Sequence, residues 1–351
     1  MKPSPRLKYL SAASIIAILV WIFWPATQVR QQMPANKIIV KNKSVEFIHQ
    51  AEKPVVKKSP VAVIPEKISS NDSATLVAKA YAAELSFPAY SQPLSDNDVD
   101  RLEPNYFNPQ SIPVDDNGAT ISATLSKYRY TYPEPVLATL NGENIDSAQL
   151  QLIDTTSGKI LLTRHFTQDD SQWLAEFDGE RNLPMQLQAR VTAQVNGKNV
   201  TLALALKYVD SVATLEGFEP AFNQDADMVL QANLTTHEQG LYRVRANLFD
   251  ANHQPIAHLV SKEKLNKGSS SIELKAHQSV LQGRQAPFYL ATFSIERMSP
   301  APGKPTKYGD SAINQYEIKN FAVSSLSDTP YQPSAQEQQR LKLLQNMAQG
   351  G

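Results

Sequence analysis

The chain has 351 residues, no cysteine and a formal net charge of zero at pH 7. The absence of cysteine excludes a disulfide framework, a thiolate nucleophile and a cysteine zinc site. Residues 81–210 carry 17 acidic and 9 basic side chains, whereas residues 211–330 carry 12 and 11. An acidic part followed by a neutral part argues against nucleic-acid binding, which uses a clustered basic surface, so we expect no nucleic-acid partner.

The first feature along the chain is the apolar run Tyr9–Trp24, which continues through Pro25 and Ala26 without a charge. As a helix this run would measure about 27 Å, close to the ~30 Å hydrocarbon core of a bilayer. Residues 1–26 therefore predict a short cytoplasmic tail and a transmembrane helix, with the lipid bilayer as the partner of residues 9–26.

The flanks of this run bear on cleavage and orientation. Ala26 and Ala35 are candidate residues before a signal-peptidase cut, but Trp24 and Met33 stand at −3, where a small residue is needed. This favours an uncleaved anchor, with a cleaved signal as the alternative. Basic residues flank both sides almost equally, and the short tail is the easier part to retain. We expect the N-terminus in the cytoplasm and the bulk of the chain outside.

Residues 27–73 have the composition of a linker. They contain prolines at intervals, many lysines and valines, and no glycine. Such a segment is expected to be extended and semi-rigid. Residues 74–87 then have helical composition and an apolar stripe, which predicts a short helix that leads into a first domain spanning residues 74–210.

From Ala119 the apolar residues recur at every second position, which is the period of a half-buried strand. The strongest turn signal of the chain is Asn196-Gly197, between the alternating runs 185–195 and 200–209. Residues 211–328 repeat the pattern of short alternating segments separated by turn residues. The sequence thus predicts two antiparallel β-sandwich domains in tandem.

One part of the second domain resembles a known module. The segments that carry the resemblance are Gly240–Val244, Asn247–Asp250, Pro255–Ala257, Gly268, Ile272–Leu274 and Pro287–Leu290. Over about residues 240–325 they resemble the accessory immunoglobulin-like modules of bacterial envelope and secreted proteins. The resemblance implies a fold and no chemistry, because this architecture serves many functions.

Residues 329–351 form the predicted C-terminal helix and tail. Ser334 and Glu337 have the spacing of a capping box, and Leu341, Leu344 and Ala348 form an apolar stripe. This stripe predicts docking on the second sandwich or on a partner. The complete expected fold class is mainly β, with an N-terminal transmembrane helix, an extended linker, two tandem immunoglobulin-like antiparallel sandwiches and a short C-terminal helix.

Acidic and histidine motifs give little support for an enzyme or a metal site. Asp96, Asp98 and Asp100 have calcium-loop spacing, but Arg101 and Phe107 stand where an EF-hand needs Gly and Glu. His237-Glu238 begins like a zinc-protease motif, yet the second histidine is missing four residues on. The spacing of His253 and His258 allows them to face each other across a hairpin, although a pair like this is usually incidental. We expect no catalytic residue, no metal and no cofactor.

The aromatic residues Tyr128, Tyr130 and Tyr132 are the candidate ligand-binding residues. At period two they share one face of a strand, and an open face would offer an aromatic platform to a glycan or a protein. The alternative is that the three rings fill the first core or its rim.

These observations lead to a functional hypothesis with two alternatives. The leading hypothesis is a non-catalytic, single-pass protein of the bacterial inner membrane that presents its sandwiches in the periplasm to an unknown envelope protein. The first alternative is an envelope-polysaccharide or ligand-binding module that uses the three tyrosines. The second is an envelope hydrolase with a site that no motif reveals.

Overall fold

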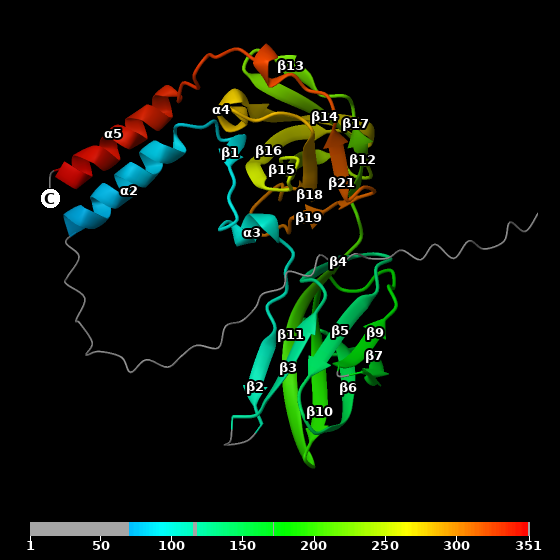
Figure 1. Ribbon diagram of the computed structural model, residues 1–351. Coiled ribbons are helices and arrows are strands. Elements are labelled where there is room, and N and C mark those ends of the chain that lie inside the picture. The colour runs from blue at the N-terminus through cyan, green and yellow to red at the C-terminus, as the bar shows by residue number, and fades with distance from the viewer. Residues whose placement is uncertain (1–69, 115–117, 171, 350–351) are drawn as a thin grey trace, which may run out of the picture. The chain divides into compact units, whose positions relative to one another are not determined.

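The computed structural model describes residues 70–114, 118–170 and 172–349, and strands dominate them (Figure 1). The predicted transmembrane helix and nearly all of the linker lie outside these residues. None of the helices within them combines the length and the apolar character needed to cross a membrane. The helical elements of the described residues are α2 (Ser70–Glu84), α3 (Val99–Leu102), α4 (Gln278–Leu281), a 3-10 helix (Val323–Ser325) and α5 (Ala335–Gln349).

The first sandwich consists of two five-stranded sheets, in the orders β2-β3-β5-β9-β8 and β4-β11-β10-β6-β7. Every pairing is antiparallel except that of β4 with β11. The strands are β2 (Gln110–Pro113), β3 (Thr120–Leu125), β4 (Arg129–Thr131), β5 (Val136–Asn141), β6 (Ile145–Asp154), β7 (Ile160–His165), β8 (Thr167–Asp169), β9 (Gln172–Phe177), β10 (Gln186–Val195) and β11 (Lys198–Val209).

The longest hairpin of this sandwich confirms the strongest turn prediction. Asn196 and Gly197 join β10 to β11, with φ angles of 50° and 73°. Positive φ at both central residues is what a two-residue hairpin turn requires. The alternating apolar residues of β10, from Leu187 to Val195, are buried as predicted. They pack with the alternating leucines of β11 in the core of this sandwich.

The second sandwich also has two sheets. One has the order β1-β16-β15-β18-β19, with β21 also on β18, and the other the order β13-β14-β12-β20, with β17 also on β14. The strands are β1 (Ser91–Pro93), β12 (Ala213–Phe218), β13 (Phe222–Gln224), β14 (Asp227–Thr236), β15 (Gly240–Phe249), β16 (Pro255–Leu265), β17 (Gly268–His277), β18 (Phe288–Arg297), β19 (Lys307–Tyr308), β20 (Asp310–Ser311) and β21 (Gln315–Ile318).

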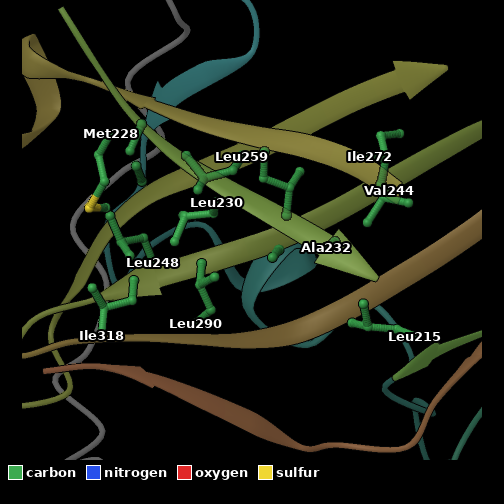
Figure 2. Close-up of a cluster of buried hydrophobic side chains, with 14 of the residues drawn as sticks. Leu215, Met228, Leu230, Ala232, Val244, Leu248, Leu259, Ile272, Leu290 and Ile318 are labelled. Atoms are coloured by element: carbon green, nitrogen blue, oxygen red, sulfur yellow. The ribbon is translucent and has the colours of Figure 1, made fainter. Parts of the chain in front are cut away.

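Apolar side chains from both sheets fill the space between them. Figure 2 shows this cluster, with Leu230 of β14 beside Leu248 of β15 and Leu259 of β16. All three are completely buried. The period-two patterns of β14 and β15 produce this core, because alternate side chains of a strand point to opposite faces of its sheet. The prediction of a mainly β protein with two antiparallel sandwiches is confirmed at this level.

The segment before the first sandwich differs from the sequence-based assignment. Residues 74–118 were predicted to belong to the first domain. In the structure β1 pairs with β16 and extends a sheet of the second sandwich, whereas Phe107 packs into the first core. Pairing between strands so distant in sequence leaves no local pattern in a three-residue strand. The predicted helix 74–87 is observed as α2, shifted toward the N-terminus.

The capping box of the C-terminal helix is confirmed. The carboxylate of Glu337 accepts hydrogen bonds from the backbone N–H (2.7 Å) and the hydroxyl (2.8 Å) of Ser334, and this hydroxyl accepts from Glu337 N at 3.3 Å. Helix α5 lies alongside α2 (Figure 1) rather than on the second sandwich. Its side chains Leu343 and Met347 remain exposed. The stripe residues Leu341, Leu344 and Ala348 are partly buried, and the helix that neighbours α5 is α2.

Candidate functional site

The outer face of one sheet in the second sandwich carries an unusual set of charged side chains. Along β15, Tyr242, Val244, Ala246 and Leu248 point into the core. The intervening residues Arg243, Arg245 and Asn247 point the other way. Opposite them on β16 lie Lys262, Val260 and His258, in that register. The alternation that builds the core thus also builds a cationic outer face.

A cavity of about 350 Å³ opens over this face. Strands β15, β16 and β18 form its floor, and the segment from the end of α2 to Pro104 forms its rim. We call it the basic cavity. It is lined by Glu84, Ala89, Gln92, Asp100, Arg101, Pro104, Arg243, Arg245, His258, Val260, Lys262, Thr292 and Ser294.

A buried carboxylate organises two of the arginines. Glu296 of β18 has only 7% of its side chain exposed. One of its oxygens accepts from Nε of Arg243 at 2.8 Å and also from Nη2 of that residue. The other accepts from Nη2 of Arg245 at 2.6 Å. Two guanidiniums that share one carboxylate leave one positive charge uncompensated beside the cavity.

Arg245 is only partly satisfied by this arrangement. Its Nη2 also donates to the hydroxyl of Ser294 at 3.1 Å, but its Nε is buried without a hydrogen-bond partner in the described part of the chain. A buried donor without an acceptor costs about 1–3 kcal/mol. Such a cost is expected where a side chain serves something besides the fold.

His258 is held neutral by the same surroundings. Burial lowers its pKa to about 4, with further lowering by Arg101 and Arg245 and a weaker opposing effect of Asp98. Asn247 donates from Nδ2 to the carbonyl of Arg101 at 2.6 Å. Its Oδ1 lies 2.7 Å from Nδ1 of His258, so the ring carries its proton on Nδ1. At neutral pH the imidazole therefore presents an acceptor at Nε2.

The backbone is irregular at the same place. The pairing of β15 with β18 shifts register between Arg245 and Asn247. Across the shift, Thr292 has φ of 57°, a left-handed conformation that is costly for a β-branched residue. Strained residues of this kind concentrate at binding and active sites. Thr292 lines the basic cavity, which links the strain to the charged cluster.

The structure does not bring the three candidate tyrosines onto one open face. Strand β4 is only three residues long, and Tyr130 is completely buried in the first core. Tyr128 precedes the strand and is 38% exposed. Tyr132 follows it and lies beneath the guanidinium of Arg181, at 4.5 Å from the ring centre. Tyr130 lies in the first core and Tyr132 packs against it. These two rings therefore follow the alternative, in which the tyrosines fill the core or its rim, and ligand binding by the three tyrosines stays a prediction.

The acidic and histidine motifs also separate in space. Asp98 accepts from the backbone and hydroxyl of Ser95 in a local turn. The ring of His253 stacks on that of Tyr289, with centroids 4.8 Å apart, whereas His258 bonds Asn247. Within the described residues no group of three metal-ligating side chains comes together.

The residues of the basic cavity were missed at the level of sequence. Arg243 and Arg245 stand in an alternating segment that was interpreted only as a strand. The available signal was their spacing, since two cations two residues apart share the outer face of a strand. No such signal exists for Glu296 or Arg101, because strand pairing and the packing of α3 bring them there from distant segments.

A larger cavity, of about 960 Å³, lies between residues 278–286 and 319–328. None of its lining residues is a buried polar or charged side chain. A site with convergent polar groups and perturbed titration is the better candidate for binding, which favours the smaller basic cavity.

No protein-family model matches the sequence, and no curated protein matches it significantly. Among solved structures, a DUF4785 family protein from Legionella pneumophila is similar over 57% of this chain and 57% of its own, with 13% identity and a TM-score of 0.42. A Salmonella alpha-2-macroglobulin is similar over 60% and 15%, with 11% identity and a TM-score of 0.31. The IG1 and IG2 domains of DIP-gamma match over 53% and 92%, with 9% identity and a TM-score of 0.20. Values this low do not place the chain in a family.

Proposed function

We propose that the protein is a non-catalytic binding protein, and that its second sandwich contacts an acidic surface of a partner protein through the basic cavity. The observation that carries this proposal is the pair of guanidiniums on the single buried carboxylate of Glu296. A partly buried positive charge without a full counterion attracts an anionic partner and steers its approach.

The chemistry of the cavity favours binding over catalysis. A general base needs a free nitrogen or carboxylate whose pKa lies near the working pH. His258 has a free Nε2, but its pKa of about 4 makes it a weak base at neutral pH. Glu296 is fully engaged by arginines. These features speak against the hydrolase alternative.

The polysaccharide alternative receives less support than a protein partner. Sugar rings are commonly held against aromatic side chains, which offer flat apolar surface. Neither phenylalanine, tyrosine nor tryptophan lines the basic cavity. Of the three tyrosines on which that alternative rested, Tyr130 belongs to the core.

The cellular setting is part of the proposal. Residues 9–26 anchor the chain in the bacterial inner membrane by a single pass, the linker spaces the sandwiches from it, and both sandwiches lie in the periplasm. The immunoglobulin-like character of residues 240–325 belongs to the same proposal. Fractionation with protease accessibility tests the topology: digestion of the sandwiches in spheroplasts is expected, and their protection there would contradict it.

Photocrosslinking in intact cells tests the binding role. A photoreactive amino acid replaces the exposed Ala89 on the rim of the cavity, and a second one replaces Lys198 at the exposed hairpin of the first sandwich. We expect a protein adduct from position 89 that weakens in high salt, because screening reduces attraction between exposed charges. Equal adducts from both positions, or adducts insensitive to salt, would remove the support for this face.

A further inference from the structure

We infer that the basic cavity is a receptor for one carboxylate, supplied by an acidic side chain of the partner protein, with Arg245 and Lys262 as the residues that bind it. This inference rests on the proposed binding function and adds the chemical class of the ligand. It follows from four properties of the cavity: its free donors, its charge, its lining and its size.

The free donors lie on neighbouring strands. Nη1 of Arg245 and Nζ of Lys262 make no hydrogen bond or ion pair with the rest of the described chain. Arg245 pairs with Val260 across the ladder and Arg243 with Lys262, so Arg245 and Lys262 are diagonal neighbours on one face. Diagonal neighbours are about 7–8 Å apart at the backbone, a separation that two long side chains can bridge around one carboxylate.

The position of the Arg245 side chain is not fixed by a full set of hydrogen bonds, because its Nε has no acceptor among the described residues. Its Nε is too deeply placed to meet a ligand without a shift of the side chain. A second carboxylate at the cavity would draw the guanidinium outward and let a planar carboxylate engage two of its N–H groups. Arg243 would keep Glu296 neutralised during this shift, because two of its nitrogens already bond that carboxylate.

The charge of the cavity matches a ligand with a single negative charge. Its lining includes four cations, Arg101, Arg243, Arg245 and Lys262, and two anions, Glu84 and Asp100. The buried Glu296 is a third anion, so one positive charge remains. One carboxylate balances it, whereas a phosphate dianion would reverse the sign and meet two acidic residues on the rim.

The lining and the size point to a side chain rather than a polymer. A volume of about 350 Å³ accommodates one amino-acid side chain with some water. Among the described residues, no phenylalanine, tyrosine or tryptophan lines the cavity, so the ring of a uronic acid, the carboxylate source of a polysaccharide, finds none of these side chains to stack on. Val260 and the stems of Lys262 and Arg243 offer apolar surface to the methylene groups of a glutamate.

The experiment uses the full chain in detergent micelles and four probes at equal ionic strength. The probes are an Ala-Glu-Ala peptide that is acetylated and amidated at its ends, the matching Ala-Gln-Ala peptide, sodium phosphate and sodium glucuronate. Titrations are followed by NMR of the His258 ring, assigned with H258Q. We expect the Glu peptide to bind at least tenfold more tightly than the other three. It should also raise the pKa of His258 from about 4, because a bound anion offsets the repulsion by Arg101 and Arg245.

Two matched variants test the assigned residues. Lys262→Gln should weaken binding of the Glu peptide about tenfold. Lys264→Gln, on the same strand outside the cavity, should leave this binding unchanged. Arg245→Gln should weaken binding of the Glu peptide and reduce the rise of the His258 pKa that this peptide causes. Equal binding of both peptides, a preference for phosphate or glucuronate, or unchanged binding by Lys262→Gln would overturn the inference. Salt-sensitive crosslinks at position 89 without peptide binding would remove only the carboxylate assignment, and loss of both would remove the proposed function.

Discussion

Tyr130 belongs to a spacing of tyrosines that would suit an exposed strand face, yet its side chain lies in the first core. Its hydroxyl lies 2.9 Å from the hydroxyl of Ser126 and accepts from the backbone N–H of Lys127 at 3.2 Å. These bonds allow a polar ring tip to be buried, because a buried hydroxyl without partners would be costly. Burial also raises the pKa of Tyr130, so the phenol stays protonated.

We therefore expect Tyr130→Ala to destabilise the first sandwich by about 3–5 kcal/mol, the usual cost of deleting a buried aromatic ring. Tyr130→Phe should cost about 1–3 kcal/mol, because it leaves the groups around the hydroxyl unpaired. Tyr128→Ala, at the exposed neighbour, is the control and should change stability by less than 1 kcal/mol, as is usual for surface positions. Urea unfolding measures all three, and equal losses at 128 and 130 would contradict the assignment.

Glu296 is the second residue whose burial decides its role. Glu296→Ala should destabilise the second sandwich by about 3 kcal/mol, at the low end for a buried pair because both guanidiniums are partly exposed. Glu273→Ala is the control, since Glu273 is 48% exposed in its contact with Lys275, and should cost about 1 kcal/mol or less. Chemical denaturation followed in the second sandwich makes the comparison, and similar losses would mean that Glu296 is not needed as a counterion.

The strand elements illustrate what local pattern can and cannot predict. The hairpin of β10 and β11 was predictable because turn chemistry and alternation occur together in one continuous segment. Strands β1, β19 and β20 were not predictable, because each has only two or three residues, and the partners of β1 and β20 are distant in the chain. The rim of the basic cavity depends on β1, so the site was unpredictable for the same reason.

At this scale the turn itself can be tested. Gly197→Ala should destabilise the first sandwich by about 1–2 kcal/mol, because Gly197 has φ of 73° and a side chain disfavours that region. Gly217→Ala is the matched control: it lies in β12, has open space around it and has no positive φ. We expect it to be neutral or slightly stabilising. Thermal unfolding distinguishes the two, and a neutral Gly197→Ala would exclude a strained turn.

The helices obey local rules more fully than the strands. Ser334 and Glu337 form the predicted box because both partners lie within one turn of α5. The partner of α5 was not predictable, since α2 lies at the other end of the described chain. An apolar stripe indicates that a helix docks, but its sequence does not name the surface that receives it.

At the scale of the whole molecule, the described residues form two hydrophobic cores, one in each sandwich. Their number was predictable from the two sets of alternating segments, whereas the tandem order was not, because β1 joins a sheet of the second sandwich from a position before the first. The assignment of the residues before Ala119 to one core or the other was not predictable, because it depends on long-range strand pairing. The predicted membrane anchor lies outside the described residues and stays a prediction.

Two cores should give two unfolding transitions that respond to different substitutions. Leu150→Ala and Leu248→Ala each remove a completely buried side chain and should cost about 2–5 kcal/mol in their own sandwich. Trp173 lies in β9 of the first sandwich, so its fluorescence reports that sandwich once Trp21 and Trp24 are replaced by phenylalanine. The midpoint of the unfolding transition reported by Trp173 should fall in Leu150→Ala and remain unchanged in Leu248→Ala. A shift of this signal by both variants would mean that the sandwiches unfold as one.

The pairing of β1 with β16 has a consequence for how the protein is made. Strand β1 precedes the entire first sandwich in the chain, and its partner follows it. The first sandwich is therefore an insert within the second. On the ribosome it can fold as soon as it emerges, while β1 must wait, unpaired, for β16 to be synthesised. The rim of the basic cavity is then among the last parts to assemble, so a truncated or stalled chain would display the first sandwich without a competent binding cavity.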